Sequence, residues 1–320
     1  MVNRSHGAET RALESEVLKL FKEAKLKSLA FLLVGCTGAG KSSTVNRLVG
    51  REIASTGKFA PETARVDAFC GEIEGFEYRV YDTPGLCDEE SQKGNDKRYM
   101  GLIREEINEI DLLLYVVQLP RNRVGADEKR AIRILTRTFG KRVWNHALVV
   151  FTFSRDVPDD EFQEWREKRS TLILEEIRRH APNAKLEPEH FVCIDNVEDL
   201  EGEDVGLPEL WAQAYARMES KGLLPFLFSQ ARRLRSRSND SMKPLKICED
   251  GSESVALSTR QREIIVERTK GSFARLASLA ASCAAVGATV GAAISAGLGS
   301  AIGASIGALI GGLLGLFRRD

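Results

Sequence analysis

The feature that most limits the fold of this chain is an apolar, strand-like run that leads directly into a glycine-rich loop. Residues 29–34, LAFLLV, are continuously apolar, as in a strand buried on both faces of a sheet. The next residues, GCTGAGKSS (35–43), match the pattern G-x-x-x-x-G-K-[ST], and a helix-like stretch follows. Glycines allow the backbone N–H groups of such a loop to close around phosphate oxygens. This order of strand, loop and helix predicts a phosphate-binding loop in an α/β domain.

Each residue of this loop has a chemical role in the prediction. Lys41 would bring a positive charge to the β- and γ-phosphates of a nucleotide, and the Ser42 hydroxyl would bind Mg²⁺. The amino terminus of the following helix would face the anion, because its first N–H groups have no partner within the helix. The predicted phosphate-binding residues are Gly35, Thr37, Gly38, Ala39, Gly40, Lys41, Ser42 and Ser43.

A second motif, DTPGL (82–86), follows a strand-like segment and predicts the other half of the same site. Asp82 stands where P-loop proteins have an aspartate that reaches Mg²⁺, usually through a water molecule. The N–H of Gly85 is in position to sense a γ-phosphate. Between the two motifs, Thr56 and Thr63 are alternatives for the threonine that closes over Mg²⁺, and Thr63 is favoured.

Leu86, the last residue of this motif, bears on the rate of hydrolysis. Many GTPases have a glutamine directly after the D-T-P-G or related motif, and that glutamine orients the attacking water. A leucine side chain cannot do so. We therefore expect slow hydrolysis in the monomer, unless another part of the chain or a partner supplies the missing group.

Apolar runs and charged, helix-like stretches alternate up to about residue 228. Further apolar runs lie at 110–119, 146–153 and 190–195, and the helix-like stretches lie at 96–109, 126–139 and 160–180. This alternation predicts an α/β fold in which a mostly parallel sheet is covered by helices on both faces. Residues 65–82 predict an antiparallel hairpin at one edge of the sheet, with its turn at Gly75.

Three further segments flank this domain. Residues 1–27 have apolar positions near helical spacing and predict an amphipathic helix. Residues 229–270 contain many Arg, Ser, Asp and Glu residues and predict a flexible linker. Residues 271–320 are rich in Gly, Ala, Ser and aliphatic residues, and Arg275 is the single charge between 272 and 317. This last segment predicts a helical membrane anchor.

The form of the anchor has three open interpretations. Two spans near 274–294 and 298–317 would form a hairpin, which keeps the basic residues before and after the segment on the cytosolic side. One span near 298–317 would form a single-pass tail anchor. The segment could also be a soluble or peripheral helix, because residues 276–294 are only marginally apolar.

The composition indicates which kinds of partner and which cellular compartment to expect for this chain. The 46 basic and 46 acidic residues give a formal net charge of +0, which provides no reason to expect a nucleic-acid partner. The six cysteines include no CxxC pair, and the four histidines have no metal-ligand spacing. Scattered cysteines of this kind predict reduced thiols in a cytosolic protein.

Three segments together resemble a known family. The sequences GCTGAGKSSTVNRLVG (35–50), DTPGL (82–86) and RNRVGADEKRAIRILTRTFGKRVWNHALVVFT (121–152) resemble the septin-related GTPases of the AIG or immune-associated (GIMAP-like) type. They are also similar to the chloroplast import-receptor (Toc) GTPases. The resemblance covers roughly residues 28–215. It implies a GTP-binding AIG-type domain over 28–228, dimerisation across the bound nucleotide and, in many members, a C-terminal membrane anchor.

The resemblance also implies roles for individual residues. Arg123 matches an arginine that lies at the dimer face, near the partner's nucleotide, in the Toc-like branch. The family recognises the base with an acidic residue followed by asparagine, which carries over to Asp195 and Asn196. The usual Asn/Thr-Lys-x-Asp motif lacks its lysine after Thr152, so Asp156, after a one-residue shift, is the alternative. A carboxylate at either place favours guanine, which presents two N–H donors on one edge.

These observations predict a membrane-anchored GTP-binding protein on the cytosolic face of an intracellular membrane. It would bind GTP or GDP together with Mg²⁺ and act as a switch or scaffold whose dimerisation depends on the nucleotide. It would hydrolyse GTP slowly. Its partners would be further copies of the chain, in a homodimer or homo-oligomer across the nucleotide face, together with membrane lipid and an unidentified protein. Two alternatives are a GTP-binding module with little hydrolysis and a nucleotide-gated effector whose tail inserts into membranes.

Overall fold

A computed structural model gives the fold of the chain over most of its central part. The described residues are 28–54, 67–73, 75–83, 101, 104–107, 109–196, 206–230, 234–236, 255–258, 260, 261, 263–265 and 267–269. Statements about the structure below refer to these residues.

A six-stranded sheet forms the centre of the fold, in the order β2-β3-β1-β4-β5-β6. The strands are β1 (Ser28–Val34), β2 (Asp67–Ile73), β3 (Phe76–Asp82), β4 (Leu112–Gln118), β5 (Ala147–Thr152) and β6 (Phe191–Cys193). Every neighbouring pair is parallel except β2 and β3, which form an antiparallel hairpin at one edge. The turn of that hairpin contains Gly75 with a φ of 80°. The predicted sheet and its edge hairpin are therefore confirmed.

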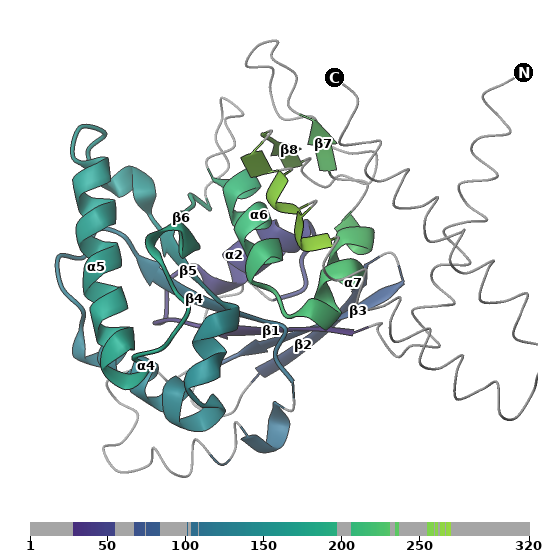
Figure 1. Ribbon diagram of the computed structural model, residues 1–320, viewed down its shortest axis with the longest axis horizontal. Helices are drawn as coiled ribbons and strands as arrows, with labels where there is room; N and C mark the ends of the chain where they lie inside the picture. Colours follow the sequence, from purple (N-terminus) through teal and green to yellow (C-terminus); the bar gives the residue numbers. More distant parts are fainter. Residues whose placement is uncertain are drawn as a thin grey trace, which may run out of the picture.

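Helices cover both faces of this sheet. They are α2 (Lys41–Val49), α4 (Ala126–Phe139), α5 (Phe162–His180), α6 (Leu207–Arg217) and α7 (Ser220–Gln230), with single 3-10 turns at Lys141–His146, Ser154–Asp156 and Pro188–His190. Figure 1 shows α4 and α5 together on one side of the sheet and α6 and α7 on the other. The predicted helices at 126–139 and 160–180 correspond to α4 and α5.

The alternation of side chains along β1 explains why helices are needed on both faces. Phe31 and Leu33 belong to a core shared with α2, α6 and α7, whereas Leu32 and Val34 belong to a second core shared with α4 and α5. All four side chains are fully buried. A strand that is apolar at every position can be buried in this way only between two layers of helices.

Within the range 229–270, which the composition predicts to be a flexible linker, the structure describes several short segments. Two short strands, β7 (Leu234–Ser236) and β8 (Val255–Leu257), pair in parallel. Val255, Leu257 and Ile265 are buried in the same core as α6. The Tyr215 hydroxyl of α6 also forms a 2.8 Å hydrogen bond with Thr269. The described parts of this range thus pack against the domain, because isolated apolar residues between the polar ones reach its core.

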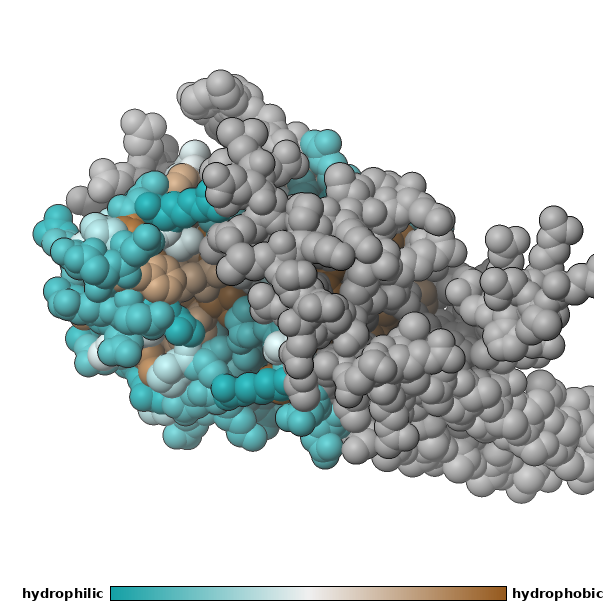
Figure 2. Space-filling view, turned by 90° about the horizontal axis from the view of Figure 1, so that it is seen from above, coloured by the Kyte–Doolittle hydropathy of each residue, from teal (hydrophilic) through white to brown (hydrophobic). Residues whose placement is uncertain are grey.

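Several predicted features lie outside the described residues: the helix at 1–27, Thr56, Thr63, Gly85, Leu86 and the segment 271–320. Within the part of the chain that is described, no helix combines the length and the apolar character that crossing a membrane requires. On the face seen in Figure 2, the described surface is mainly hydrophilic, with apolar residues visible between the charged ones.

Candidate nucleotide-binding site

The glycine-rich loop joins the carboxyl end of β1 to the first turn of α2, as predicted. Gly38 and Gly40 have φ values of 75° and 87°, in the left-handed region that favours glycine. Gly35 is constrained by space instead, because a Cβ at this position would lie 2.1 Å from the carbonyl oxygen of Val116 in β4. The glycines at these positions therefore let the loop turn tightly against the end of the sheet.

Side chains from three neighbouring strands hold the carbonyl groups of this loop. The Thr152 hydroxyl at the end of β5 donates to Ala39 O at 2.8 Å. Asn196, just after β6, donates from Nδ2 to Gly40 O at 3.2 Å, and Gln118 at the end of β4 donates to Gly38 O at 3.5 Å. These contacts fix the carbonyl oxygens of the loop against the ends of the sheet, and a fixed glycine-rich backbone of this kind is what an anion-binding nest requires.

Lys41 folds back over the loop toward Asp82. Its Nζ donates to Gly35 O at 3.1 Å and lies 3.7 Å from Asp82 Oδ1, at the end of β3. Thr83, the next residue, donates from its hydroxyl to Leu33 O at 2.9 Å and so fixes the end of β3 against β1. Lys41 and Asp82 are only 10% and 17% exposed, so both charges lie within the loop region and not on open surface.

The donor set around Lys41 suits Mg²⁺ bound to phosphates. Ser42 is the second residue of α2, directly after Lys41, and Asp82 supplies a carboxylate 3.7 Å from the Lys41 ammonium. A hydroxyl and a carboxylate are the oxygen ligands with which P-loop proteins hold this ion together with phosphate oxygens and water. Ser42, Asp82 and the predicted third ligand Thr63 would therefore hold the metal, although Thr63 lies outside the described residues.

Of the predicted base-binding residues, Asn196 contacts the loop directly. Its Nδ2 donates to both Gly40 O and Thr44 Oγ1, at 3.2 and 2.9 Å. These two bonds fix the amide, and its Oδ1 is buried without a hydrogen-bond partner among the described residues. A buried acceptor of this kind is costly unless a partner satisfies it. Asn196 thus has one oxygen available to a ligand at the edge of the loop.

The two candidate aspartates differ in their surroundings. Asp195 is 5% exposed, and its Oδ2 lies 3.3 Å from Arg155 Nε. Its carbonyl oxygen also accepts a hydrogen bond from Arg47 of α2. Asp156 is exposed and ends the turn Ser154–Asp156, where its N–H donates to Phe153 O at 3.2 Å. The structure therefore brings Asn196 to the phosphate-binding loop, places Asp195 against Arg155 and Arg47, and leaves Asp156 exposed.

Phe153 is a candidate that the sequence reasoning missed. It directly follows Thr152, its backbone is left-handed with a φ of 56°, and its side chain is 38% exposed. A bulky non-glycine residue in this conformation is strained, and such strain is concentrated at functional sites. The sequence signal was an aromatic residue at the carboxyl end of a buried strand, beside the loop, where a flat side chain can contact a base.

Arg123 lies in the loop between β4 and α4, on the surface. Its carbonyl oxygen accepts a 2.8 Å hydrogen bond from Arg169 of α5. Its side chain is exposed and makes no hydrogen bond or ion pair with any described residue. A nearby contact joins this loop region to the phosphate-binding loop, because the Cys36 thiol donates to Asp127 Oδ2 at 2.9 Å. Arg123 is thus available to a partner molecule.

These features define a P-loop GTPase-like α/β fold with a mostly parallel sheet. Residues 29–187 match the AIG1 family, and the chain carries an AIG1-family domain in that range. The resemblance predicted from the sequence is therefore confirmed.

The related proteins are chloroplast translocases. The chain is 35% identical over 170 residues to translocase of chloroplast 34 from Pisum sativum, covering 52% of this chain and 54% of that protein. It is 32% identical over 182 residues to translocase of chloroplast 33 from Arabidopsis thaliana, covering 55% and 61%. The matched region thus spans little more than half the length of either relative.

Solved structures of Toc33 from Arabidopsis thaliana are also similar. One is a dimerization-deficient R130A mutant, with 27% identity, a TM-score of 0.49 and coverage of 71% of this chain and 94% of that one. Another is in complex with GDP and Mg²⁺, with 25% identity, a TM-score of 0.48 and coverage of 78% and 96%.

Proposed function

We propose that this chain is a membrane-anchored, GTP-binding protein that pairs with a second copy in a nucleotide-dependent way and hydrolyses GTP slowly. The observation that carries the proposal is the phosphate-binding loop itself. Its carbonyls are tied to three strands, and Lys41 and Asp82 meet across it at 3.7 Å. A loop fixed in this way needs little rearrangement to bind a nucleotide phosphate with Mg²⁺.

The ligands of the related proteins support this assignment. Toc33 from Arabidopsis thaliana is in complex with GDP and Mg²⁺ in one structure and with Mg²⁺ and GMPPNP in another. In this chain, Lys41 would neutralise the β- and γ-phosphates, while Ser42, Asp82 and Thr63 would hold Mg²⁺. The N–H of Gly85 would contact the γ-phosphate.

For the base, we propose Asn196 and Asp195 in preference to Asp156. The spare Oδ1 of Asn196 can accept from a base N–H, and Asp195 is next to it and nearly buried. The ion pair with Arg155, 3.3 Å away, would help to hold the Asp195 carboxylate in one position. Phe153 would contact the flat face of the base. The Asp195 carboxylate and the Asn196 amide oxygen both accept hydrogen bonds. They therefore match the edge of guanine that presents two N–H donors, and they do not match the corresponding edge of adenine.

Nucleotide selectivity provides the test. Full-length protein in mild detergent is titrated with labelled GTP, GDP and ATP in the presence of Mg²⁺, and turnover is measured on the same samples. We expect GTP and GDP to bind at least about a hundredfold more tightly than ATP, as for a site whose buried polar groups match one base. Comparable binding of ATP, or no binding of any of the three, contradicts the proposal. Binding without turnover favours the alternative of a module with little hydrolysis, for which Leu86 is the supporting observation.

We further propose that Arg123 contributes to the pairing of two copies. It is exposed and charged, and its backbone is held by Arg169 of α5 in the loop between β4 and α4. For the related chloroplast translocon components atToc33 and psToc159, dimerization is important for the GTPase activity. Sedimentation of Arg123→Ala with a GTP analogue should show a weaker dimer than the wild type, whereas Asn122→Ala, at the neighbouring exposed position, should not. An unchanged dimer affinity in Arg123→Ala excludes it from the contact.

The membrane anchor remains part of the proposal and rests on residues 271–320. Their composition and the basic residues at both ends favour insertion with the nucleotide-binding domain on the cytosolic side. The relatives named as chloroplastic make the chloroplast a candidate organelle. Protease mapping of the extreme C-terminus in isolated membranes distinguishes a hairpin, whose end faces the cytosol, from a single-pass anchor.

A further inference from the structure

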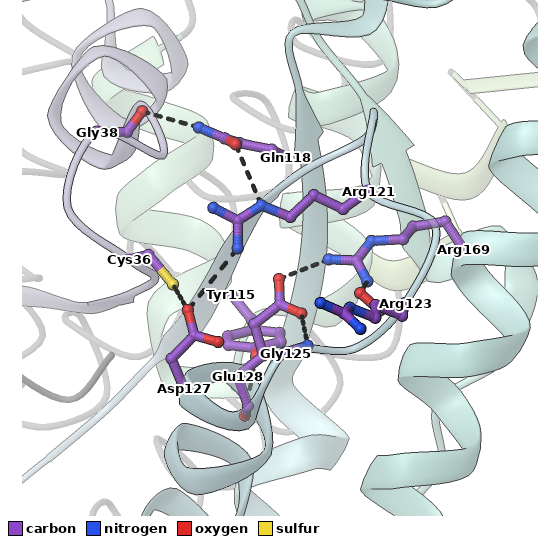
Figure 3. A network of polar contacts seen from close by, with 10 residues as sticks. All are labelled: Cys36, Gly38, Tyr115, Gln118, Arg121, Arg123, Gly125, Asp127, Glu128 and Arg169. Carbon is purple, nitrogen blue, oxygen red and sulfur yellow. Dashed lines mark hydrogen bonds and ion pairs between the residues drawn. The ribbon is translucent and has the colours of Figure 1, made fainter. Parts of the chain in front are cut away.

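Two separate contacts join the phosphate-binding loop to the first turn of α4 and to the end of β4, on either side of the loop between these elements. In the first, the Cys36 thiol donates to Asp127 Oδ2 at 2.9 Å. In the second, Gln118 donates to Gly38 O at 3.5 Å while its own Oε1 accepts from Arg121 Nε at 3.2 Å. Figure 3 shows that Arg121 connects the two, because its guanidinium lies between the Gln118 amide and the Asp127 carboxylate.

The other side of this loop is held by a buried ion pair. Arg169 of α5 lies 2.5 Å from Glu128, and both side chains are at most 1% exposed. Arg169 also donates to Arg123 O at 2.8 Å, and the second carboxylate oxygen of Glu128 accepts from Gly125 N–H at 2.9 Å. A charge pair this deeply buried and hydrogen-bonded resists rearrangement, because breaking it would leave an uncompensated charge. The end of the loop next to α4 is therefore fixed.

The pair formed by Arg121 and Asp127 is of the opposite kind. The two groups are 3.7 Å apart and are 38% and 19% exposed. Ion pairs in such positions contribute little stability, because water screens them and the long side chain keeps alternative positions. The Arg121 side chain can therefore move in response to a nearby charge. It lies beside the phosphate-binding loop, and a bound nucleoside triphosphate would bring one more negative phosphate group to that loop than a diphosphate.

We propose that Arg121 and Asp127 are positioning residues that couple the phosphate-binding loop to residues 119–125, so that the bound nucleotide changes how this loop presents Arg123. The proposal rests on the proposed function, since it assumes that the phosphate-binding loop takes a nucleotide. One end of residues 119–125 is fixed by Arg169 and Glu128, so a shift at Cys36 or Gly38 is transmitted to the other end through Asp127, Gln118 and Arg121. The nucleotide and the partner then act on one connected element and not on two independent loops.

Hydrogen exchange in the segment 119–129 provides a direct test. Full-length protein in mild detergent is kept at a concentration at which mass photometry shows monomers, so that pairing contributes nothing. Saturating GMPPNP with Mg²⁺ should slow exchange in this segment at least about fivefold, the lower end of measured couplings between two sites. In Arg121→Ala the change should fall below about twofold although the analogue is still bound, because the connection through Gln118 and Asp127 is lost.

Two matched variants separate coupling from general loosening of the loop. Asp127→Asn keeps an oxygen that can accept from the Cys36 thiol but removes the charge that Arg121 faces. It should lose the response as Arg121→Ala does, and the double variant should lose no more than either single one. Asn122→Ala alters the neighbouring exposed residue, which makes no hydrogen bond or ion pair among the described residues, and should keep the wild-type response.

The outcomes distinguish this proposal from the one on which it rests. The coupling is wrong if the wild type binds GMPPNP without a change of exchange at 119–129. It is equally wrong if Arg121→Ala keeps the full response, or if Asn122→Ala loses it. A wild-type protein that binds no guanine nucleotide is a different result, since it removes the proposed function together with the coupling.

Discussion

Two lysine–aspartate pairs lie at opposite ends of the central sheet, and they differ in what surrounds them. Lys41 Nζ lies 3.7 Å from Asp82 Oδ1 at the carboxyl end of β3. Lys221 Nζ lies 3.9 Å from Asp111 Oδ1, just before β4 begins. The charges and separations are similar, so neither property alone distinguishes a binding site from a structural contact.

The backbone around each pair provides the distinction. Lys41 and Asp82 meet at a glycine-rich loop whose carbonyls are bound by side chains from the neighbouring strand ends. Asp111 instead uses its own carboxylate to accept from Ala30 N–H at 2.9 Å, and its carbonyl oxygen accepts from Glu219 N–H at 2.8 Å. The second aspartate therefore joins β1, β4 and the start of α7, and the comparison suggests that only the first pair serves a ligand.

Exchanging each lysine for alanine gives the largest expected difference between the two ends. Lys41→Ala should weaken nucleotide binding at least about a thousandfold, or roughly 4 kcal/mol, because the phosphates lose the side-chain cation of the loop. Lys221→Ala should leave nucleotide affinity unchanged. Titration with a fluorescent GTP analogue measures both, and circular dichroism checks that each variant is folded. Tight binding by folded Lys41→Ala would remove this lysine from the site.

A methyl group at Gly35 tests how closely the carboxyl end is packed. The new Cβ would lie 2.1 Å from Val116 O, and a strand carbonyl cannot move aside easily. Gly35→Ala should therefore lower the free energy of unfolding by about 3 kcal/mol. Gly38→Ala is the matched control in the same loop, since no atom lies within 4 Å of its added Cβ and only the positive φ is unfavourable. It should cost about 1 kcal/mol. Equal losses in urea denaturation would contradict the packing argument.

The parts of the fold that sequence predicts well are those set by local pattern. The helix-like stretch 126–139 coincides with α4, because its apolar residues follow helical spacing and glycines flank it at 125 and 140. The phosphate-binding loop was also predictable, since its glycines, Lys41 and Ser42 are adjacent in the chain. Such features depend on neighbours within a few residues, and one sequence contains all of that information.

Contacts between distant residues were not predictable in the same way. The double hydrogen bond of Asn196 to Gly40 and Thr44 joins residues more than 150 positions apart. The burial of Val255 and Ile265 was hidden by the charged residues around them, which made the whole range resemble a linker. The left-handed backbone of Phe153 has no local signal either, since only the surrounding tertiary structure can impose it.

The second aspartate predicts a pH dependence of stability. Burial raises the pKa of Asp111 to about 6, against the opposing effects of the Ala30 hydrogen bond and Lys221, while Glu219 and Glu109 raise it further. Between pH 4 and 6 the folded protein therefore keeps a proton that the unfolded chain has released. The contribution of Asp111 to stability is greatest at low pH and is lost as the pH rises through this window.

Asp111→Asn isolates this contribution. The amide keeps an acceptor for the Ala30 N–H but does not titrate. The free energy of unfolding of the variant minus that of the wild type should therefore increase by roughly 1 kcal/mol between pH 5 and pH 7. Urea denaturation at both pH values measures the difference. A difference that is independent of pH, or that decreases as pH rises, would show that Asp111 does not titrate in this range.

Lys221 should have the smallest effect, and its direction sharpens the comparison with Lys41. Its ammonium lies 2.6 Å from Glu109, 3.8 Å from Glu219 and 3.9 Å from Asp111, and the side chain is 33% exposed. Lys221→Met keeps the aliphatic stem and removes the charge. At pH 7.5, above the pKa of Asp111, the variant should lose a few tenths to about 1 kcal/mol of stability, as is usual for partly exposed ion pairs. At pH 5 the loss should be smaller, because Asp111 is then mostly protonated. Removing the Lys221 charge then leaves less repulsion between Asp111 and the neighbouring Glu109 and Glu219. A larger loss at pH 5 than at pH 7.5 would contradict this account, and so would any change in nucleotide affinity, which belongs to the pair at the other end of the sheet.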